Sequence, residues 1–224
     1  MYKKNDSLVI VFSLLFILSS CTESQERPPA DAPGSVFSLS GYPNSNAVEG
    51  NSTETASKWI FLAGGCFWGV EKYLALIPGV LKTEVGYANG RTEYPSYEDV
   101  CYRNTGHAET VLVEYNSDKL ELSFLLDLFY KVIDPTSLNR QGNDVGTQYR
   151  TGIYYVDEAD LNIIDASISS LSERTTRPVV VEVKPLENYY AAEDYHQKYL
   201  EKNPGGYCHI SNDKFAEVSG LKWD

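Results

Sequence analysis

Hydrophobic positions early in the folded part of the chain change from a strand pattern to a helix pattern within a few residues. Residues 58–63 form an apolar run of strand length, and apolar side chains then recur at helical spacing from Val70 to Ile77, until Pro78-Gly79. Gly64-Gly65-Cys66 lies between the two patterns. The sequence therefore predicts a buried strand, a glycine turn and a helix that begins next to Cys66.

Similar patterns continue to the end of the chain. Further strands are expected at 80–87, 107–115, 149–156 and 179–183, and helices at 120–133, 158–173 and 190–200, before an irregular tail. The polar stretches 88–106 and 136–146 are expected to be loops, and loops this long are commonly functional. The expected fold class is α+β: an α/β sandwich with a mixed, mainly antiparallel sheet covered by helices.

The N-terminal part of the chain has the features of a targeting segment. Lys3 and Lys4 precede an apolar stretch, residues 8–18, that is too short to span a bilayer. Leu18-Ser19-Ser20-Cys21 follows and resembles the lipobox of bacterial lipoproteins, in which the cysteine is lipidated and becomes the mature N-terminus. We therefore expect a signal peptide at 1–21. The alternatives are an ordinary cleaved signal and an uncleaved anchor.

Composition separates a tether from a folded domain. Residues 22–57 are rich in Ser, Pro, Asn, Glu and Gly and contain too few apolar residues to fold, so we expect a flexible tether there and a domain at 58–224. The net charge of −12 argues against nucleic acid and against an anionic membrane surface as partners. Membrane contact is expected only through the lipid on Cys21, in an exported protein anchored in the cell envelope.

The position of Cys66 suggests a reactive thiol. Backbone N–H groups and the dipole at a helix N-terminus favour negative charge, so the sequence predicts that Cys66 is held partly as a thiolate, which is the nucleophilic form. The flanking glycines would let a substrate approach the backbone closely. The alternative is a buried cysteine that acts only as a small apolar residue.

The other cysteines leave several possibilities open. With Cys21 lipidated, the remaining thiols are Cys66, Cys101 and Cys208, and an odd number suggests that at least one of them is free. Cys208 lies in a turn-rich segment that could bring a second thiol to Cys66. In an oxidising compartment, a static Cys66–Cys208 or Cys101–Cys208 disulfide is the alternative.

A histidine base would make Cys66 a hydrolase nucleophile, but the sequence gives this little support. The chain contains three histidines: His107, His196 and His209. Gly-Cys-Phe-Trp is distantly similar to the cysteine region of papain-like proteases, but that signature requires a cysteine where this chain has Ala63. Metal binding is also poorly supported, because the ligand spacings of a metal site are missing.

Glu109 is a candidate acid. It lies where a polar loop enters the strand expected at 107–115, and it shares a face with Val111 and Val113. A carboxyl group on the inner face would have a raised pKa and could donate a proton. The alternative is a solvated residue at the edge of the strand.

Taken together, these stretches resemble one family, the peptide-methionine (S)-S-oxide reductases, also called A-type methionine sulfoxide reductases. The resemblance covers nearly all of residues 58–224. The motifs that carry it are Gly65-Cys66-Phe67-Trp68-Gly69, Gly106-His107-Ala108-Glu109, Gln141-Gly142-Asn143-Asp144, Gly146-Thr147-Gln148-Tyr149-Arg150 and Tyr207-Cys208. The resemblance implies a ferredoxin-like βαβ core with flanking helices and long irregular loops.

The resemblance also implies a role for each site residue. Cys66 attacks the sulfoxide sulfur, and Phe67 and Trp68 form the apolar wall that receives the S-methyl group. Glu109 protonates the sulfoxide oxygen, which the hydroxyl groups of Tyr97 and Tyr149 hold. Asp144 helps to organise the site, and Cys208 resolves the Cys66 sulfenic acid to a disulfide.

The implied reaction needs no cofactor or metal, only a thioredoxin-like reductant. The expected substrates are S-epimer methionine sulfoxide in proteins and in free form. Cys208 is the last cysteine of the chain, so the resolving relay is expected to be a single step, with Cys101 a bystander. A cysteine hydrolase and a disulfide-stapled lipoprotein that binds a partner through its tyrosine-rich loops are the alternative functions.

Overall fold

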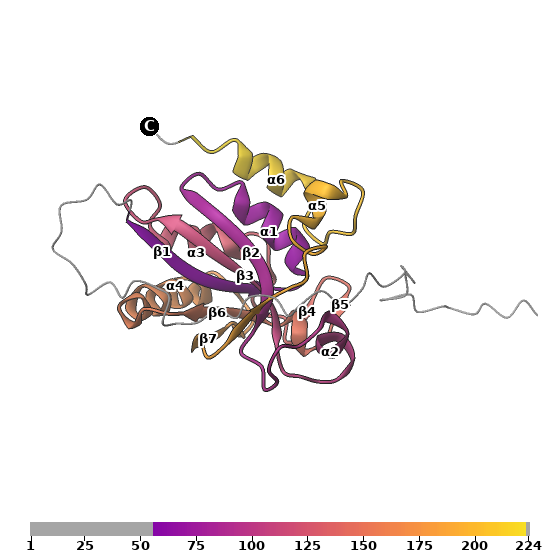
Figure 1. Cartoon of the computed structure of the whole chain (residues 1–224). Coiled ribbons are helices and arrows are strands. Elements are labelled where there is room, and N and C mark those ends of the chain that lie inside the picture. The colour runs from indigo at the N-terminus through magenta and orange to yellow at the C-terminus, as the bar shows by residue number, and fades with distance from the viewer. Residues whose placement is uncertain (1–55, 223–224) are drawn as a thin grey trace, which may run out of the picture. The chain divides into compact units, whose positions relative to one another are not determined.

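The centre of the fold is a six-stranded sheet. In the computed structural model, which describes residues 56–222, the strands lie in the order β7-β6-β1-β3-β2-β8 (Figure 1). Their bounds are β1 Ser57–Gly64, β2 Val80–Ala88, β3 Ala108–Asn116, β6 Thr151–Tyr155, β7 Glu182–Pro185 and β8 Tyr189–Ala191. All neighbours pair antiparallel except β6 and β7, which are parallel, so the predicted mixed, mainly antiparallel sheet is confirmed.

The order of the elements matches a ferredoxin-like core. The chain runs β1, α1 (Phe67–Ala75), β2, β3, α3 (Leu122–Tyr130) and β6, while the sheet places these four strands as β6-β1-β3-β2. β1 is therefore a central strand with partners on both sides, and it ends at the turn that carries Cys66. The expected α+β fold class is confirmed.

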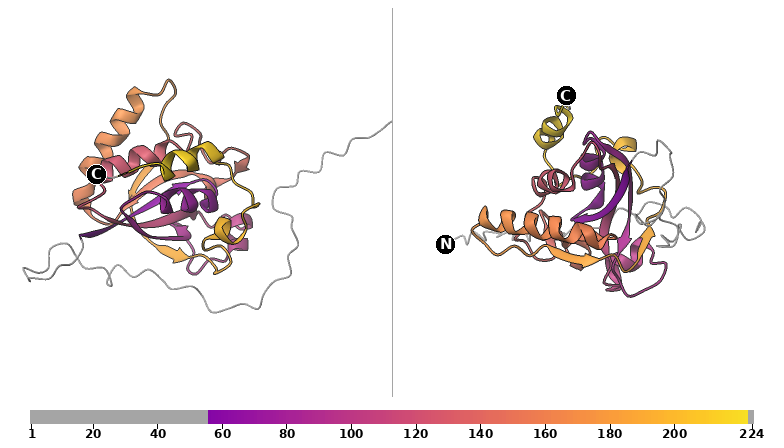
Figure 2. Two further views of the ribbon diagram at one scale, coloured as in Figure 1. Left: turned by 90° about the horizontal axis from the view of Figure 1, so that it is seen from above. Right: turned by 90° about the vertical axis from the view of Figure 1, so that its left-hand side faces the viewer.

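The helices bury one large hydrophobic cluster against the sheet. Val70 and Leu74 of α1, Phe129 of α3 and Ile164 of α4 (Leu161–Glu173) belong to this cluster together with Ile60 of β1. α3 and α4 lie against each other, and α6 (Asn212–Ser219) lies against α1 (Figure 2). A smaller cluster, which includes Phe61, Leu112 and Tyr189, lies on the opposite face of the central strands. β1 and β3 are therefore buried on both faces.

The structure corrects the first long loop. Residues 88–106 contain a short helix, α2 (Tyr97–Tyr102), which begins at a capping box. Ser96 Oγ accepts a hydrogen bond from the Asp99 N–H (3.2 Å), and the Asp99 carboxylate accepts one from the Ser96 N–H (3.0 Å). Only Val100 of α2 is buried, so the apolar spacing that identifies longer helices is missing from its sequence.

The C-terminal part of the chain also differs from expectation. The helix expected at 190–200 is replaced by β8, which pairs with β2, followed by turns and the short helix α5 (Tyr199–Lys202). The tail is not irregular, since α6 forms there and buries Phe215 and Val218. The strand expected at 179–183 pairs only from Glu182 onward, as β7. In each case tertiary contacts outweigh the local pattern.

The remaining elements are short. The second polar stretch, 136–146, contains the two-residue strands β4 (Arg140–Gln141) and β5 (Asp144–Val145). The 3-10 turns η2 (Thr147–Tyr149) and η3 (Glu158–Asp160) precede β6 and α4. Within residues 56–222, no helix is long and apolar enough to cross a membrane. The predicted signal peptide, Cys21 and nearly all of the predicted tether lie outside the described residues.

Candidate active site

A strained glycine turn places Cys66 at the start of α1. Gly65 has a φ of +85°, and a Cβ added there would lie 2.5 Å from the Cβ of Gln141, so only glycine fits. Cys66 is the residue immediately before α1, and the backbone N–H of Trp68 acts to lower the pKa of its thiol. The turn therefore places Cys66 at the N-terminal end of the helix, as the sequence predicted.

The charge state of Cys66 differs from the prediction. Burial, which leaves 7% of the residue exposed, holds the pKa of the Cys66 thiol well above its usual range. The nearby carboxyl groups of Glu109 and Asp144 raise this pKa further, and the Trp68 N–H opposes them only in part. Cys66 is therefore a thiol in the resting site, and the expectation of a partial thiolate was wrong because burial outweighs the end of the helix.

Glu109 lies beside this thiol as a neutral carboxyl group. Its side chain is on β3, it is 1% exposed, and its Oε2 atom accepts a hydrogen bond from the Phe67 N–H at 3.1 Å. Burial raises the pKa of Glu109 to about 8, and the charge on Asp144 contributes to the increase. At neutral pH, Glu109 is therefore mostly protonated, and it is held against the same helix N-terminus as Cys66.

An aromatic cluster forms the wall next to Cys66. Phe67 is buried against Tyr87 and His196, with ring centroids 5.9 and 5.1 Å apart. Trp68 stacks on Tyr199, with ring centroids 3.9 Å apart, and its indole N–H donates to His196 Nδ1 at 2.9 Å. Both predicted wall residues are therefore fixed by neighbours rather than loosely placed.

The predicted polar residues come from two loops. Tyr97, the first residue of α2, donates its backbone N–H to Glu193 (2.9 Å), and its ring lies 4.5 Å from that of His196. Tyr149 is buried at the end of η2, close to β3. Asp144 on β5 accepts a hydrogen bond from the Tyr207 hydroxyl at 3.1 Å, and burial raises its pKa.

The second thiol, Cys208, lies along α1. A Cβ added to Gly69, one helical turn after Cys66, would lie 2.8 Å from the Cys208 sulfur. A charge on Cys208 would raise the pKa of the Cys66 thiol, so the two thiols lie close enough to belong to one site. Cys208 also lines a cavity of about 340 Å³, together with Lys72, Ser211 and Phe215. Cys66, Cys101 and Cys208 are all free, so neither proposed static disulfide is present.

Sequence reasoning missed His196 and Glu193. His196 is 1% exposed and lies among the rings of Phe67, Trp68, Tyr97 and Tyr195. Burial lowers the pKa of His196 to about 3, so its ring is neutral. Glu193 accepts hydrogen bonds from the Tyr87 hydroxyl (2.8 Å) and the Tyr97 N–H. The density of Tyr residues around His196 was the available signal.

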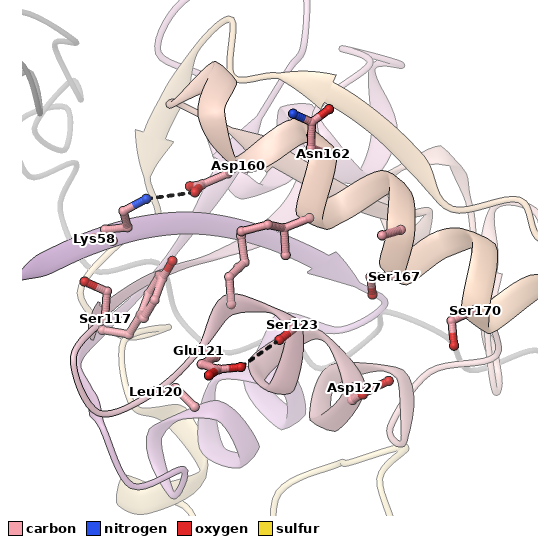
Figure 3. Close-up of a pocket in the computed structure, with 14 residues that line it drawn as sticks. Lys58, Ser117, Leu120, Glu121, Ser123, Asp127, Asp160, Asn162, Ser167 and Ser170 are labelled. Atoms are coloured by element: carbon pink, nitrogen blue, oxygen red, sulfur yellow. Dashed lines mark hydrogen bonds and ion pairs between the residues drawn. The ribbon is translucent and has the colours of Figure 1, made fainter.

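Another cavity lies away from Cys66. A groove of about 680 Å³ runs between α3 and α4, with Lys58 of β1 at one end, where its ammonium group contacts Asp160 at 2.8 Å (Figure 3). Its lining contains no cysteine or histidine. Cavity volume therefore does not locate the chemistry, whereas the cluster of perturbed thiols and carboxyl groups around Cys66 does.

A thiol at a helix N-terminus, a neutral carboxyl group and a second free thiol define the class of thiol-dependent oxidoreductases. Residues 58–222 match the family model described as peptide methionine sulfoxide reductase. The chain belongs to this family, whose enzymes reduce methionine sulfoxide.

The similar proteins support this assignment. A "Peptide methionine sulfoxide reductase MsrA" of Clostridium perfringens is 63% identical over 156 residues, 70% of this chain and 99% of the relative. The protein of the same name from Lachnoclostridium phytofermentans is 60% identical over 159 residues, 71% of this chain and 96% of the relative. Both relatives are covered almost completely, so the match is to a whole enzyme.

Solved structures agree. The reduced form of Mxr1 from Saccharomyces cerevisiae superposes with a TM-score of 0.67 at 37% identity, covering 70% of this chain and 92% of that one. Methionine sulfoxide reductase A of Corynebacterium diphtheriae gives a TM-score of 0.63 at 35% identity, with 79% and 90% covered. This chain therefore shares its fold with a solved methionine sulfoxide reductase A.

Proposed function

We propose that this enzyme reduces the S epimer of methionine sulfoxide, in proteins and in free form, with Cys66 as the nucleophile. Cys66 sulfur attacks the sulfoxide sulfur while the Glu109 proton moves to the oxygen. This attack forms a bond between the two sulfur atoms. That bond and the S–O bond of the substrate then break as the hydroxyl group passes to the Cys66 sulfur, so methionine leaves and Cys66 becomes a sulfenic acid. The proton lost by the Cys66 thiol restores Glu109 to its neutral form.

One observation carries this proposal: a buried, neutral Glu109 shares the N-terminus of α1 with Cys66. A sulfoxide oxygen is a poor leaving group, so the reaction requires an acid that is still protonated at neutral pH. A protonated Glu109 carries no negative charge, so it does not repel a thiolate on Cys66. Deprotonation of the thiol therefore becomes easier in the state that can protonate the substrate.

The other predicted residues fit the same scheme. Phe67 and Trp68 would receive the S-methyl group, and the hydroxyl groups of Tyr97 and Tyr149 would hold the oxygen. Asp144, whose carboxylate accepts a hydrogen bond from the Tyr207 hydroxyl, would help to organise the site. Donors that are held in place before the reaction stabilise developing charge without reorganisation.

Cys208 is proposed as the resolving thiol. Its sulfur attacks Cys66 sulfenic acid, the Cys66 S–O bond breaks, and the Cys208 proton leaves with the hydroxide as water. A thioredoxin-like dithiol then reduces the Cys66–Cys208 disulfide. This route avoids further oxidation of the sulfenic acid, and it uses no cofactor or metal.

We also propose that the enzyme is a lipoprotein of the cell envelope, supported by the lipobox-like residues that end at Cys21. Full-length protein expressed in a bacterial host with labelled palmitate should incorporate the label and sediment with membranes. Cys21→Ala should be unlabelled. A soluble, cleaved wild-type protein whose N-terminus is not Cys21 would instead support an ordinary signal peptide.

The reaction is tested with a racemic methionine-sulfoxide peptide and dithiothreitol, followed by mass and chiral chromatography. Wild-type enzyme should consume one epimer only, and Cys66→Ser should consume neither. Cys208→Ser should complete one turnover and then stall with a thioredoxin-type reductant. Consumption of both epimers, or cleavage of an ester or peptide bond without thiol, would refute the proposal.

A further inference from the structure

The segment that leads to Cys208 is fixed to the rest of the protein at its beginning. We call residues 196–208 the resolving segment. His196 accepts the indole N–H of Trp68 (2.9 Å). The Gln197 side chain accepts the Val85 N–H (2.9 Å) and donates to the Val85 carbonyl (2.8 Å). The first residues of the segment are therefore attached to α1 and β2.

The third attachment is a buried carboxyl group, Glu71 of α1. Its Oε2 atom accepts the Lys198 N–H at 2.8 Å, and its Oε1 atom lies 3.5 Å from the Thr83 hydroxyl of β2. The residue is 2% exposed, and burial raises its pKa to about 7, with the charge on Glu201 adding to the increase and that on Lys198 opposing it. Glu71 takes no part in the sulfoxide chemistry described above.

Burying the carboxyl group of Glu71 costs free energy, which suggests that its hydrogen bond from the Lys198 N–H is important. Buried carboxyl groups normally have a strong ionic partner, but the main favourable contact of Glu71 is a backbone N–H. That N–H belongs to Lys198, whose φ is +52°. This is the left-handed region of backbone conformation, which residues other than glycine and asparagine rarely adopt. Glu71 therefore holds the residue at which the chain changes direction.

Everything after Lys198 depends on that direction. Tyr199 stacks on Trp68, and a Cβ added to Gly206 would lie 2.8 Å from the Tyr199 ring. Cys208 then contacts α1 at Gly69. Helix α1 thus carries Cys66 at its start, receives Cys208 one turn later, and anchors the resolving segment through Glu71 a few residues further on.

We propose that Glu71 is a positioning residue for the resolving step, because its hydrogen bond to Lys198 sets where Cys208 lies relative to Cys66. This inference rests on the proposed function, in which Cys208 attacks Cys66 sulfenic acid to form the disulfide and water. Glu71 touches neither sulfur. It acts through the backbone of the resolving segment.

The test compares the two chemical steps in one enzyme. Soluble protein from residue 22 onward is mixed with excess free methionine sulfoxide and no reductant, and quenched samples are analysed for methionine and for loss of thiols. Glu71→Leu removes the acceptor, while Glu71→Gln keeps an oxygen that can accept the Lys198 N–H. Glu201→Gln is the matched control, since it removes a carboxylate from α5 without touching that bond.

Formation of methionine consumes the Cys66 thiol, so the resolving step is followed by loss of the second thiol, that of Cys208. In Glu71→Leu, loss of this second thiol should slow by about tenfold or more, since small displacements of reacting groups have effects of this size, while formation of the first methionine changes less than about threefold. Glu71→Gln should recover most of the rate, and Glu201→Gln should equal wild type. Equal rates of loss of the second thiol in wild type and Glu71→Leu would overturn the inference. An equal slowing of both steps in Glu71→Leu would also overturn it. If Glu71→Leu does not fold, Glu71→Gln decides alone, and a Glu71→Gln protein that slows both steps equally would overturn the inference. If wild type itself loses no thiols, the proposed function fails instead.

Discussion

At the scale of single residues, the site depends on two groups that are neutral at rest. Burial raises the pKa values of both Cys66 and Glu109, and each charge would further oppose the other. A neutral pair avoids two buried negative charges in contact. This charge state suits the proposed reaction, in which the substrate takes the proton of Glu109 and the electrons of Cys66.

This coupling predicts the pH dependence of the first step. The pKa of Glu109 is about 8, so the fraction of enzyme with a protonated acid falls as the pH rises through that value. The rate of methionine formation in a single turnover should decrease accordingly, and Glu109→Gln should be slower by about a hundredfold or more. Rapid-quench measurements from pH 6 to pH 9.5 give both results.

Glu114→Gln is the matched control, because Glu114 lies on the same strand and its carboxylate accepts a hydrogen bond from Ser57, away from the site. This variant should keep the wild-type rate and its pH profile. A wild-type rate that stays constant up to pH 9.5 would show that Glu109 is not the acid.

At the scale of elements, short local structures place the site residues. The turn before α1 and the capping box of α2 each contain residues chosen for backbone geometry rather than for chemistry. Both determine where a reacting or binding side chain lies.

The turn before α1 should not tolerate a side chain at Gly65. Because of its positive φ and the 2.5 Å approach to Gln141, Gly65→Ala should lower the free energy of unfolding by about 1–3 kcal/mol. Gly205→Ala is the control, since nothing lies within 4 Å of its added Cβ, and it should change stability by less than about 0.5 kcal/mol. Urea unfolding of both variants measures the difference, and equal stabilities would contradict this account of the turn.

The capping box of α2 should affect substrate binding through Tyr97. Ser96→Ala removes the acceptor of the Asp99 N–H and should destabilise α2 by about 1 kcal/mol. Because Tyr97 is the first residue of α2, kcat/KM for a sulfoxide peptide should fall even at temperatures at which the variant remains fully folded. Ser123→Ala, in the first turn of α3, is the comparison, since that serine is not the helix cap. An unchanged kcat/KM in Ser96→Ala would show that the position of Tyr97 does not affect substrate binding.

At the scale of the whole molecule, buried carboxyl groups make stability depend on pH. Glu71 and Glu109 hold protons in the folded state up to about pH 7 and pH 8, whereas in the unfolded chain they lose them near 4.5. The unfolded state therefore binds fewer protons in this range, and raising the pH favours unfolding. Each unit of pKa difference corresponds to about 1.4 kcal/mol.

We therefore expect the free energy of unfolding to decrease between about pH 6.5 and pH 8.5. Burial lowers the pKa of His107, His196 and His209, so these side chains are neutral in the folded chain, whereas in the unfolded chain they still bind protons at about pH 6.5 and oppose the trend at and below that pH. The decrease is therefore expected only above about pH 6.5. In Glu109→Gln the decrease should be smaller. Urea unfolding at several pH values tests this, and a stability that rises with pH over the same range would contradict the burial of both groups.

The sequence predicted most of the core, because its strands and long helices carry regular apolar patterns. It also identified Cys66 through the change of pattern at Gly64-Gly65, and the burial of Glu109 through alternation with Val111 and Val113. α2, β8 and α6 were missed because they are short and depend on capping or on pairing with distant strands. The charge state of Cys66 was missed because burial is a property of the folded chain.

The central claim is that Cys66 and Cys208 form the redox pair of an S-specific reductase. The most direct test is to mix wild-type enzyme with excess racemic methionine sulfoxide in the absence of any reductant. We predict one methionine per protein, derived from the S epimer alone, together with a Cys66–Cys208 disulfide and a free Cys101 found by peptide mapping. Methionine formed without that disulfide, or a disulfide that includes Cys101 instead, would contradict the account.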